Sequence, residues 1–241
     1  MDGRAVRWSG RAVRTLLGAT AHPGGAALSA ELLGLLGLGP GLSLGGAVPA
    51  RGLTVADVAC GSGSTLRLLG ARGVRAVGVD VDPDAVRRSA RRGLAVVRGD
   101  ATALPLAAGS LDAAVCECSL STMSSPEAAV GAVALALRPG GVVGVTDVTA
   151  EPSLDPVVAA AVARLTTPRP LAAWVELLAG AGLAVELVQD RRAESLALVT
   201  RLRRRLVLLP GPHAVAVAAG REIEAGRLGY GLVVARRPFA V

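Results

Sequence analysis

The sequence of 241 residues predicts an α/β fold with a mostly parallel sheet and helices on both faces. Three apolar runs, near 54–59, 75–80 and 94–98, each end in small or acidic residues. A glycine-rich turn, Cys60-Gly-Ser-Gly63, follows the first run, and a helix-like pattern follows the turn. This strand–turn–helix order is typical of sites for nucleotide-type ligands. Right-handed crossovers between parallel strands then lay helices on both faces of the sheet.

The remaining elements follow from periodicity and from Gly/Pro punctuation. Further strands are expected near 112–118, 141–147, 184–189 and 229–236. Helices are expected within 4–37 and near 83–92, 126–137 and 171–181. We expect one domain over 1–241, divided into N-terminal cap helices and a Gly/Pro-rich linker (1–50), a core (51–190), a helical insert (191–226) and a last strand (227–241).

Composition limits the class of protein. Apolar residues make up 51% of the chain but aromatic residues only 2%, so the core must consist of Ala, Val and Leu. No apolar run has the length of a bilayer span, and no secretory pattern opens the chain. Three cysteines, an odd number, indicate reduced thiols. We therefore expect a cytoplasmic protein without a membrane partner.

The net charge of +7 does not predict a nucleic-acid partner. All 26 basic residues are arginine, which indicates a codon-composition bias rather than a selected basic face. The chain also has few aromatic side chains on which bases could stack. We interpret the densest basic run, 201–205, as the solvated face of a helix.

The acids at the strand ends indicate what the site binds. Asp80 lies about 20 residues beyond the glycine turn, where a carboxylate can accept hydrogen bonds from ribose hydroxyls. Asp100 and Ala101 at the next strand end can border an adenine ring. Gly61 and Gly63 allow the backbone to approach a ligand because no Cβ stands in the way.

Two phosphate-binding patterns fail. A dinucleotide site prefers a third glycine where this chain has Leu66, and a P-loop needs a lysine, which this chain lacks. The absence of lysine also removes the usual hydride-site pair of a nicotinamide oxidoreductase. S-adenosylmethionine carries adenosine, a sulfonium and an amino-acid end but no phosphate, and it is therefore the favoured ligand.

Five segments, in order, resemble class I S-adenosylmethionine-dependent methyltransferases of the small-molecule type. They are residues 57–63, 79–80, 99–101, 110–118 and 137–147. The resemblance covers roughly 20–190 and the last strand, and it departs at Ala59, where the family usually has its first glycine. It implies a Rossmann-like sheet of seven strands, mostly parallel, with an antiparallel last strand.

The resemblance also implies the roles of individual residues. The cofactor would be bound by Asp57, Ala59, Gly61, Gly63, Asp80, Val81, Asp100, Ala101, Cys118 and Ser119. The candidates for catalysis are His22, in a His-Pro-Gly-Gly turn, and Asp147, at the end of the fifth strand. No metal site is expected. The more ordinary alternatives are a turn residue for His22 and a structural strand-end carboxylate for Asp147.

We expect methyl transfer by in-line displacement to O, N, S or C of a small molecule, in an acceptor pocket built by the N-terminal helices and 191–226. Two alternatives stay open. One is an arsenite methyltransferase, because residues 112–121 resemble the strand-four region of that group and Cys116 and Cys118 should share one strand face. The other is an accessory protein that binds S-adenosylmethionine without catalysis. No motif identifies the acceptor or the oligomeric state.

Overall fold

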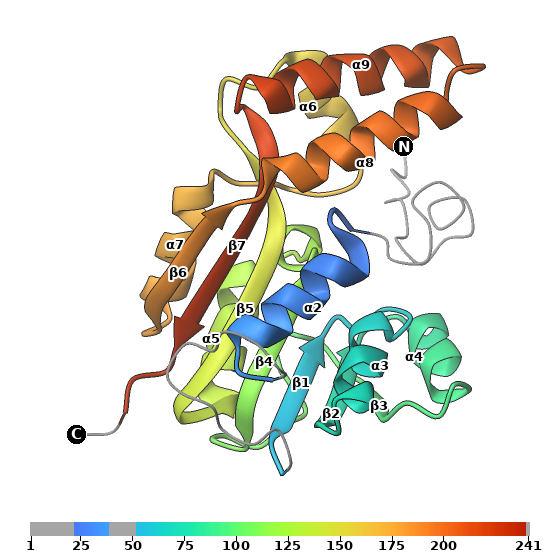
Figure 1. Cartoon of the computed structure of the whole chain (residues 1–241). Coiled ribbons are helices and arrows are strands. Elements are labelled where there is room, and N and C mark those ends of the chain that lie inside the picture. The colour runs from blue at the N-terminus through green and yellow to red at the C-terminus, as the bar shows by residue number, and fades with distance from the viewer. Residues whose placement is uncertain (1–21, 39–51, 240–241) are drawn as a thin grey trace.

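The computed structural model describes residues 22–38 and 52–239, which form one seven-stranded sheet between two layers of helices (Figure 1). The strands are β1 (Thr54–Val58), β2 (Arg75–Asp80), β3 (Val96–Arg98), β4 (Leu111–Glu117), β5 (Leu137–Ala150), β6 (Ala184–Asp190) and β7 (Leu228–Arg236). Their order is β3-β2-β1-β4-β5-β7-β6. Pairing is parallel from β3 to β5, and β7 runs antiparallel to both β5 and β6. The predicted fold class is confirmed.

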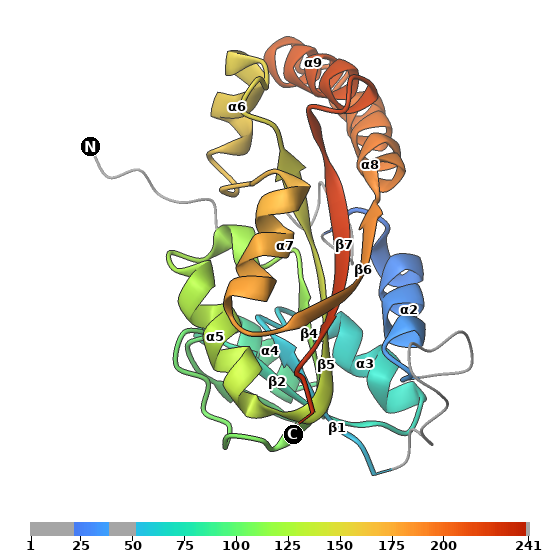
Figure 2. The same ribbon diagram turned by 90° about the vertical axis from the view of Figure 1, so that its left-hand side faces the viewer.

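The helices cover both faces, as predicted (Figure 2). They are α2 (Gly25–Leu35), α3 (Ser64–Ala71), α4 (Pro83–Ala90), the short 3-10 helix η1 (Leu120–Thr122), α5 (Pro126–Ala136), α6 (Pro156–Val162), α7 (Leu171–Gly180), α8 (Arg192–Arg205) and α9 (Pro210–Glu224). Helices α5 and α7 pack on one face of the sheet, and α2 and α3 pack on the other. The helices predicted within 4–21 and most of the predicted linker lie outside the described residues. No helix in the described ranges is both long and apolar enough to cross a bilayer.

Two cores of small side chains hold these layers on the sheet. Ala, Val and Leu dominate both cores, with Trp174 buried in one and Tyr230 in the other. Small residues also set how closely a helix approaches. A Cβ on Gly144 of β5 would lie 2.6 Å from Cδ1 of Leu32, so glycine at this position lets α2 pack directly on the strand. The predicted Ala/Val/Leu core is confirmed.

The fifth strand is longer than predicted. It starts at Leu137 rather than near residue 141, because Leu137 already pairs with Leu111 of β4. The register shifts between Leu111 and Ala113, so the Pro139-Gly-Gly141 segment is part of an irregular strand and not a strand-breaking turn. At the other end, β5 continues to Ala150 and pairs with β7 along its whole length beyond Gly141.

The ends of β5 and β7 carry a cap of three helices, α6, α8 and α9, beyond the main sheet (Figure 1). The predicted insert 191–226 is the helical pair α8 and α9, and α6 was not predicted. The cap has a small core of its own, in which Val158 of α6 packs with Ala219 and Ile223 of α9. An ion pair between Glu222 of α9 and Arg227, the residue before β7, joins the end of the cap to the start of the last strand.

Candidate functional site

A cavity of about 780 Å³ lies at the carboxyl edge of β1, β2 and β4. Parallel strands bring their carboxyl ends to one edge, so residues far apart in sequence meet there. Nine of the ten predicted cofactor residues line the cavity: Asp57, Ala59, Gly61, Asp80, Val81, Asp100, Ala101, Cys118 and Ser119. His22 lines it as well. Within the described part of the chain, no residue of 191–226 contributes to this wall, contrary to the predicted acceptor pocket.

The turn after β1 depends on left-handed backbone. Ala59, Gly61 and Gly63 have φ values of 58°, 54° and 75°. Alanine is uncommon in this region, so Ala59 holds a strained conformation in the place where the family has glycine. The Cys60 N–H donates to the Val79 carbonyl oxygen at 3.1 Å, which fixes the turn against β2. A Cβ on Gly61 would meet nothing within 4 Å, so the backbone there is open to a ligand.

Gly63 is the one predicted cofactor residue outside the cavity wall. It precedes the first residue of α3. A Cβ on Gly63 would lie 2.3 Å from Cδ1 of Leu94, which leaves no room for a side chain. Its position favours a packing role that seats α3 beside the segment before β3, with the cofactor contact left to Gly61.

Asp80, at the end of β2, is 8% exposed and held in a fixed orientation. The Gly61 N–H donates to its Oδ2 at 2.7 Å, and the Asp82 N–H donates to its Oδ1 at 2.8 Å. Each carboxylate oxygen can accept more than one hydrogen bond. Asp80 is therefore both oriented by the turn and able to accept hydrogen bonds from a ligand.

Asp57, at the end of β1, is a buried carboxylate with an unused oxygen. It is 4% exposed, and its Oδ2 has no hydrogen-bond partner among the described residues. Burial raises the pKa of Asp57 well above its ordinary value, and the nearby charges of Glu117 and Asp80 raise it further. A buried polar atom in a cavity wall without a partner is costly in the free protein and available to a ligand.

Sequence reasoning missed Glu117, the last residue of β4. Ser29 Oγ of α2 donates to its Oε2 at 2.6 Å, and Thr65 Oγ1 of α3 donates to its Oε1 at 2.8 Å. Glu117 also lines the cavity, so it joins two helices and the sheet at the site. The rule that identified Asp80, an acid at the carboxyl end of a parallel strand, applies equally to Glu117.

His22 lies at the cavity wall with both ring nitrogens turned toward protein atoms. Its Nδ1 is 2.9 Å from the Pro23 carbonyl oxygen, and its Nε2 is 3.4 Å from Ser29 Oγ. The same Nε2 lies 3.7 Å from Oε2 of Glu117. This arrangement favours a positioning role, in which His22 holds the start of α2 against Glu117, over proton transfer.

Asp147 does not line the cavity. It is 1% exposed and accepts hydrogen bonds from the Ser121 N–H at 3.0 Å, the Val148 N–H at 2.7 Å and the Ser121 hydroxyl. Burial raises the pKa of Asp147, although these hydrogen bonds act in the opposite direction. The contacts favour a structural role in which Asp147 anchors η1 to β5.

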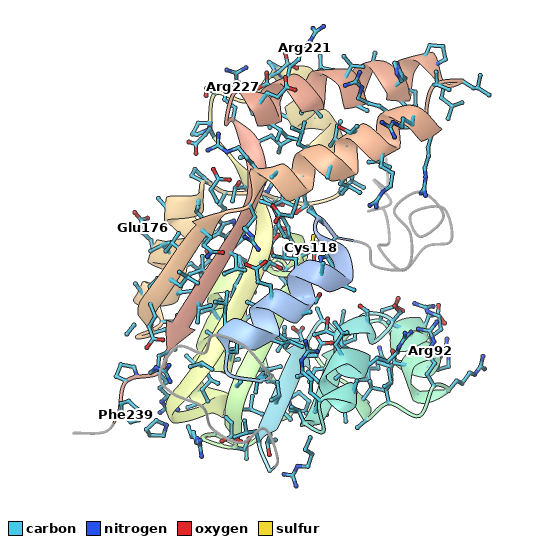
Figure 3. The ribbon with its side chains drawn as sticks, in the orientation of Figure 1. Arg92, Cys118, Glu176, Arg221, Arg227 and Phe239 are labelled. Atoms are coloured by element: carbon cyan, nitrogen blue, oxygen red, sulfur yellow. The ribbon has the colours of Figure 1, made fainter. Side chains whose placement is uncertain are left out.

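The prediction that the side chains of Cys116 and Cys118 share one face of the strand is wrong. Cys116 belongs to the core under α5 and α7, whereas Cys118 packs against the core under α2 and α3. Cys118, labelled in Figure 3, follows the last residue of β4. Its φ of 51° breaks the alternation of side chains along the strand. Burial raises the pKa of both thiols. No cluster of three metal-binding side chains occurs within 22–38 and 52–239, so these cysteines give no support to an arsenite site.

The cavity is acidic although the chain is basic. Its wall contains five carboxylates, Asp57, Asp80, Asp82, Asp100 and Glu117, and one guanidinium, Arg88. Arg88 lies 4.0 Å from Asp82 and so partly neutralises one carboxylate at the rim. Low-dielectric walls of one charge sign concentrate ligands of the opposite sign. The site is therefore suited to a cationic ligand.

Part of the chain matches a family of known proteins. Residues 56–145 match the family model described as a methyltransferase domain. A search of curated proteins finds no match. The described site falls largely inside the matched segment, which contains the glycine turn and the ends of β1, β2 and β4.

Solved structures share the fold at low sequence identity. A geranyl diphosphate C-methyltransferase from Streptomyces coelicolor A3(2) is 18% identical, with 88% of this chain and 80% of that chain covered and a TM-score of 0.73. The [4+2]-cyclase SpnF is 22% identical, with 88% and 81% covered and a TM-score of 0.70. A Haemonchus contortus phosphoethanolamine N-methyltransferase is 17% identical, with 94% of this chain but only 56% of that chain covered and a TM-score of 0.78.

The family match and the strand order agree with the acidic site at the carboxyl edge of the sheet. Residues 56–145 therefore match a methyltransferase domain, and the chain shares its fold with these solved structures.

Proposed function

We propose that this protein transfers the methyl group of S-adenosylmethionine to a small-molecule acceptor by in-line displacement. The observation that supports this most is the unpartnered Oδ2 of Asp57 in the acidic cavity. The structural neighbours named for geranyl diphosphate and phosphoethanolamine methylation are consistent with a small acceptor.

The charge of the cavity supports S-adenosylmethionine as the ligand. Its sulfonium and ammonium groups are cations, and the wall has five carboxylates against one guanidinium. A dinucleotide would bring phosphate groups into the same field and be repelled. The glycine turn also lacks the third glycine that a dinucleotide site uses.

Each part of the wall has a matching part of the ligand. Asp80, oriented by the Gly61 and Asp82 amides, accepts hydrogen bonds from the ribose hydroxyls. Asp100 and Ala101 border the adenine ring. Asp57 and Glu117 face the ammonium of the methionine end, where a cation would relieve the cost of two neighbouring buried carboxylates.

When bound, S-adenosylmethionine supplies a methyl carbon on a positive sulfur, and the acceptor's lone pair bonds to that carbon as the carbon–sulfur electrons return to sulfur. The chain contributes alignment and exclusion of water rather than a strong base. His22 has no ring nitrogen directed away from protein atoms, so it does not take the proton of an N or O acceptor. The methylated product keeps that proton until it leaves the site and releases it to bulk water.

Calorimetric binding of S-adenosylhomocysteine tests the site. We expect Asp80→Ala to weaken binding about 100-fold, because two charge-assisted hydrogen bonds are lost. Glu224→Gln, a change of the same charge on exposed α9, should leave the affinity unchanged. Equal affinity of Asp80→Ala and wild type, or tighter binding of a dinucleotide, would overturn the assignment.

Product formation tests catalysis separately. Incubation with methyl-labelled S-adenosylmethionine and a panel of small amines, phenols, thiols and prenyl diphosphates should give a labelled product with at least one class. Tight cofactor binding with no labelled product in any class would instead favour the accessory role. The [4+2]-cyclase neighbour gives a further reason to measure transfer directly, because the fold supports other reactions.

A further inference from the structure

The turn between α8 and α9 presents apolar side chains to solvent. Val207, Leu208 and Leu209 are 62%, 87% and 52% exposed. The Leu209 N–H donates to the Leu206 carbonyl oxygen at 2.8 Å, and Leu206 is buried at 8% exposure. The turn is thus tight and anchored, and it holds its apolar side chains outward. We call residues 207–210 the hairpin tip.

A basic helix end adjoins the hairpin tip. Four exposed arginines, 201, 203, 204 and 205, form the end of α8. The chain has no acidic residue between Glu194 and Glu222, so this part of the sequence carries a net positive charge. Figure 1 shows the hairpin tip at the far end of the cap, away from the sheet.

We propose that the hairpin tip is a docking surface for an anionic lipid bilayer. The three apolar side chains enter the boundary between head groups and acyl chains, and the arginines pair with head-group phosphates. Apolar side chains next to a basic cluster are the combination that binds peripheral proteins to acidic leaflets. The proposal does not depend on the identity of the methyl acceptor.

The charge distribution disfavours other occupants of the hairpin tip. A second copy would bring the same arginines against it, and like charges repel. Residues 1–21 carry four arginines and one aspartate, so this segment has the same sign of charge. Nucleic acid would use aromatic side chains for stacking, and residues 191–229 contain no Phe, Trp or Tyr.

Docking of this kind is compatible with the lack of a spanning helix. The sequence-based expectation of no membrane partner rested on the absence of a long apolar run, which excludes crossing a bilayer but not lying on one. The described helices include none that could cross, so the hairpin tip would act as a reversible surface contact.

Vesicle co-sedimentation with the full-length protein tests the proposal. Two vesicle types are compared: phosphatidylcholine alone, and phosphatidylcholine with one third phosphatidylglycerol. We expect binding to the anionic vesicles, release by high salt, and little binding to the neutral ones. The variant R203Q/R204Q should reduce the partition coefficient about 30-fold, and Leu208→Ser about tenfold.

Arg221→Gln is the charge control, because it removes one positive charge, as each change in R203Q/R204Q does, from an exposed site at the other end of α9 (Figure 3). It should bind vesicles like wild type, and thermal unfolding confirms that each variant is folded. Absent binding to anionic vesicles, or equal loss in the control, would overturn the proposal. Binding to a DNA duplex without vesicle binding, or a dimer that Leu208→Ser dissociates, would assign the hairpin tip to another partner.

Discussion

The cavity region and the cap differ in how their charged side chains are paired. Around the cavity, carboxylates are buried next to one another, and Asp57 keeps an unpaired oxygen. In the cap, the buried Glu222 is paired with the Arg227 guanidinium, and the surface carries exposed arginines and apolar side chains. The cavity region thus contains unfavourable interactions between buried charges, whereas the cap exposes groups that can bind a partner.

The two regions would gain favourable interactions on binding in different ways. A buried carboxylate without a partner lowers the stability of the free protein and is relieved by a cationic ligand. An exposed apolar turn has little effect on the free energy of unfolding, because its side chains make no contact inside the protein. Mutations should therefore have larger effects on stability around the cavity than in the cap.

The largest effect is expected for Asp147→Ala. This change leaves the buried Ser121 N–H and the Val148 N–H without an acceptor, which should cost about 3 kcal/mol of unfolding free energy. The affinity for S-adenosylhomocysteine should change little, since Asp147 lies outside the cavity wall. Urea unfolding and calorimetry check both parts. Unchanged stability with lost turnover would restore the catalytic role that the sequence suggested.

A glycine pair compares the packing of the two regions. A Cβ on Gly78 of β2 would lie 2.6 Å from Cys60 Sγ and 2.7 Å from Leu66 Cδ1, whereas on Gly220 of α9 the nearest atom would be 4.0 Å away. We expect Gly78→Ala to cost about 2 kcal/mol through overpacking. Gly220→Ala should gain about 0.5 kcal/mol from helix propensity. Similar unfolding free energies for the two variants would contradict the packing difference.

The effects of pH on stability have opposite signs in the two regions. The pKa of Asp57 is raised above 3.8, so its folded form holds a proton more tightly than the unfolded chain. Its contribution to stability therefore decreases as the pH rises above 3.8 through the folded pKa, by at most about 1.4 kcal/mol per pH unit. The pKa of Glu222 is lowered from 4.5 to about 2 by Arg227. Its contribution is present above pH 4.5 and is lost as the pH falls toward 2.

Urea unfolding across the acidic range tests both signs. Relative to wild type, Asp57→Asn should become more stable as the pH rises, and Glu222→Gln should become less stable. Parallel pH profiles for the two variants would show that the carboxylates have similar surroundings, against the contrast drawn between cavity and cap.

The sequence predicted the sheet, and it placed the candidate cofactor residues at one edge of that sheet, because both follow from local signals. Apolar runs that end in acids mark parallel strand ends, and this rule placed Asp57, Asp80 and Asp100 at one edge. It failed for side-chain direction beyond a strand end. Cys118 leaves the strand with positive φ, so strict alternation assigned it to the wrong face.

Contacts between distant elements were also beyond prediction. Glu117 satisfies the strand-end rule, but only the structure shows that Ser29 and Thr65 converge on it from two helices. In the same way, the arginine run before residue 206 looked like an ordinary solvated helix face. The apolar turn at 207–209 next to it could be recognised as a candidate binding surface only from the structure, in which its side chains are exposed.

The continuous ladder between β5 and β7, from Val142 paired with Arg236 to Ala150 paired with Leu228, has a mechanical consequence. Both strands run without interruption from beneath the cofactor edge into the cap, so the cap cannot swing as a hinged lid without breaking consecutive interstrand hydrogen bonds. If α8 and α9 bind a membrane, the cavity would therefore stay at a fixed distance and angle from the membrane surface.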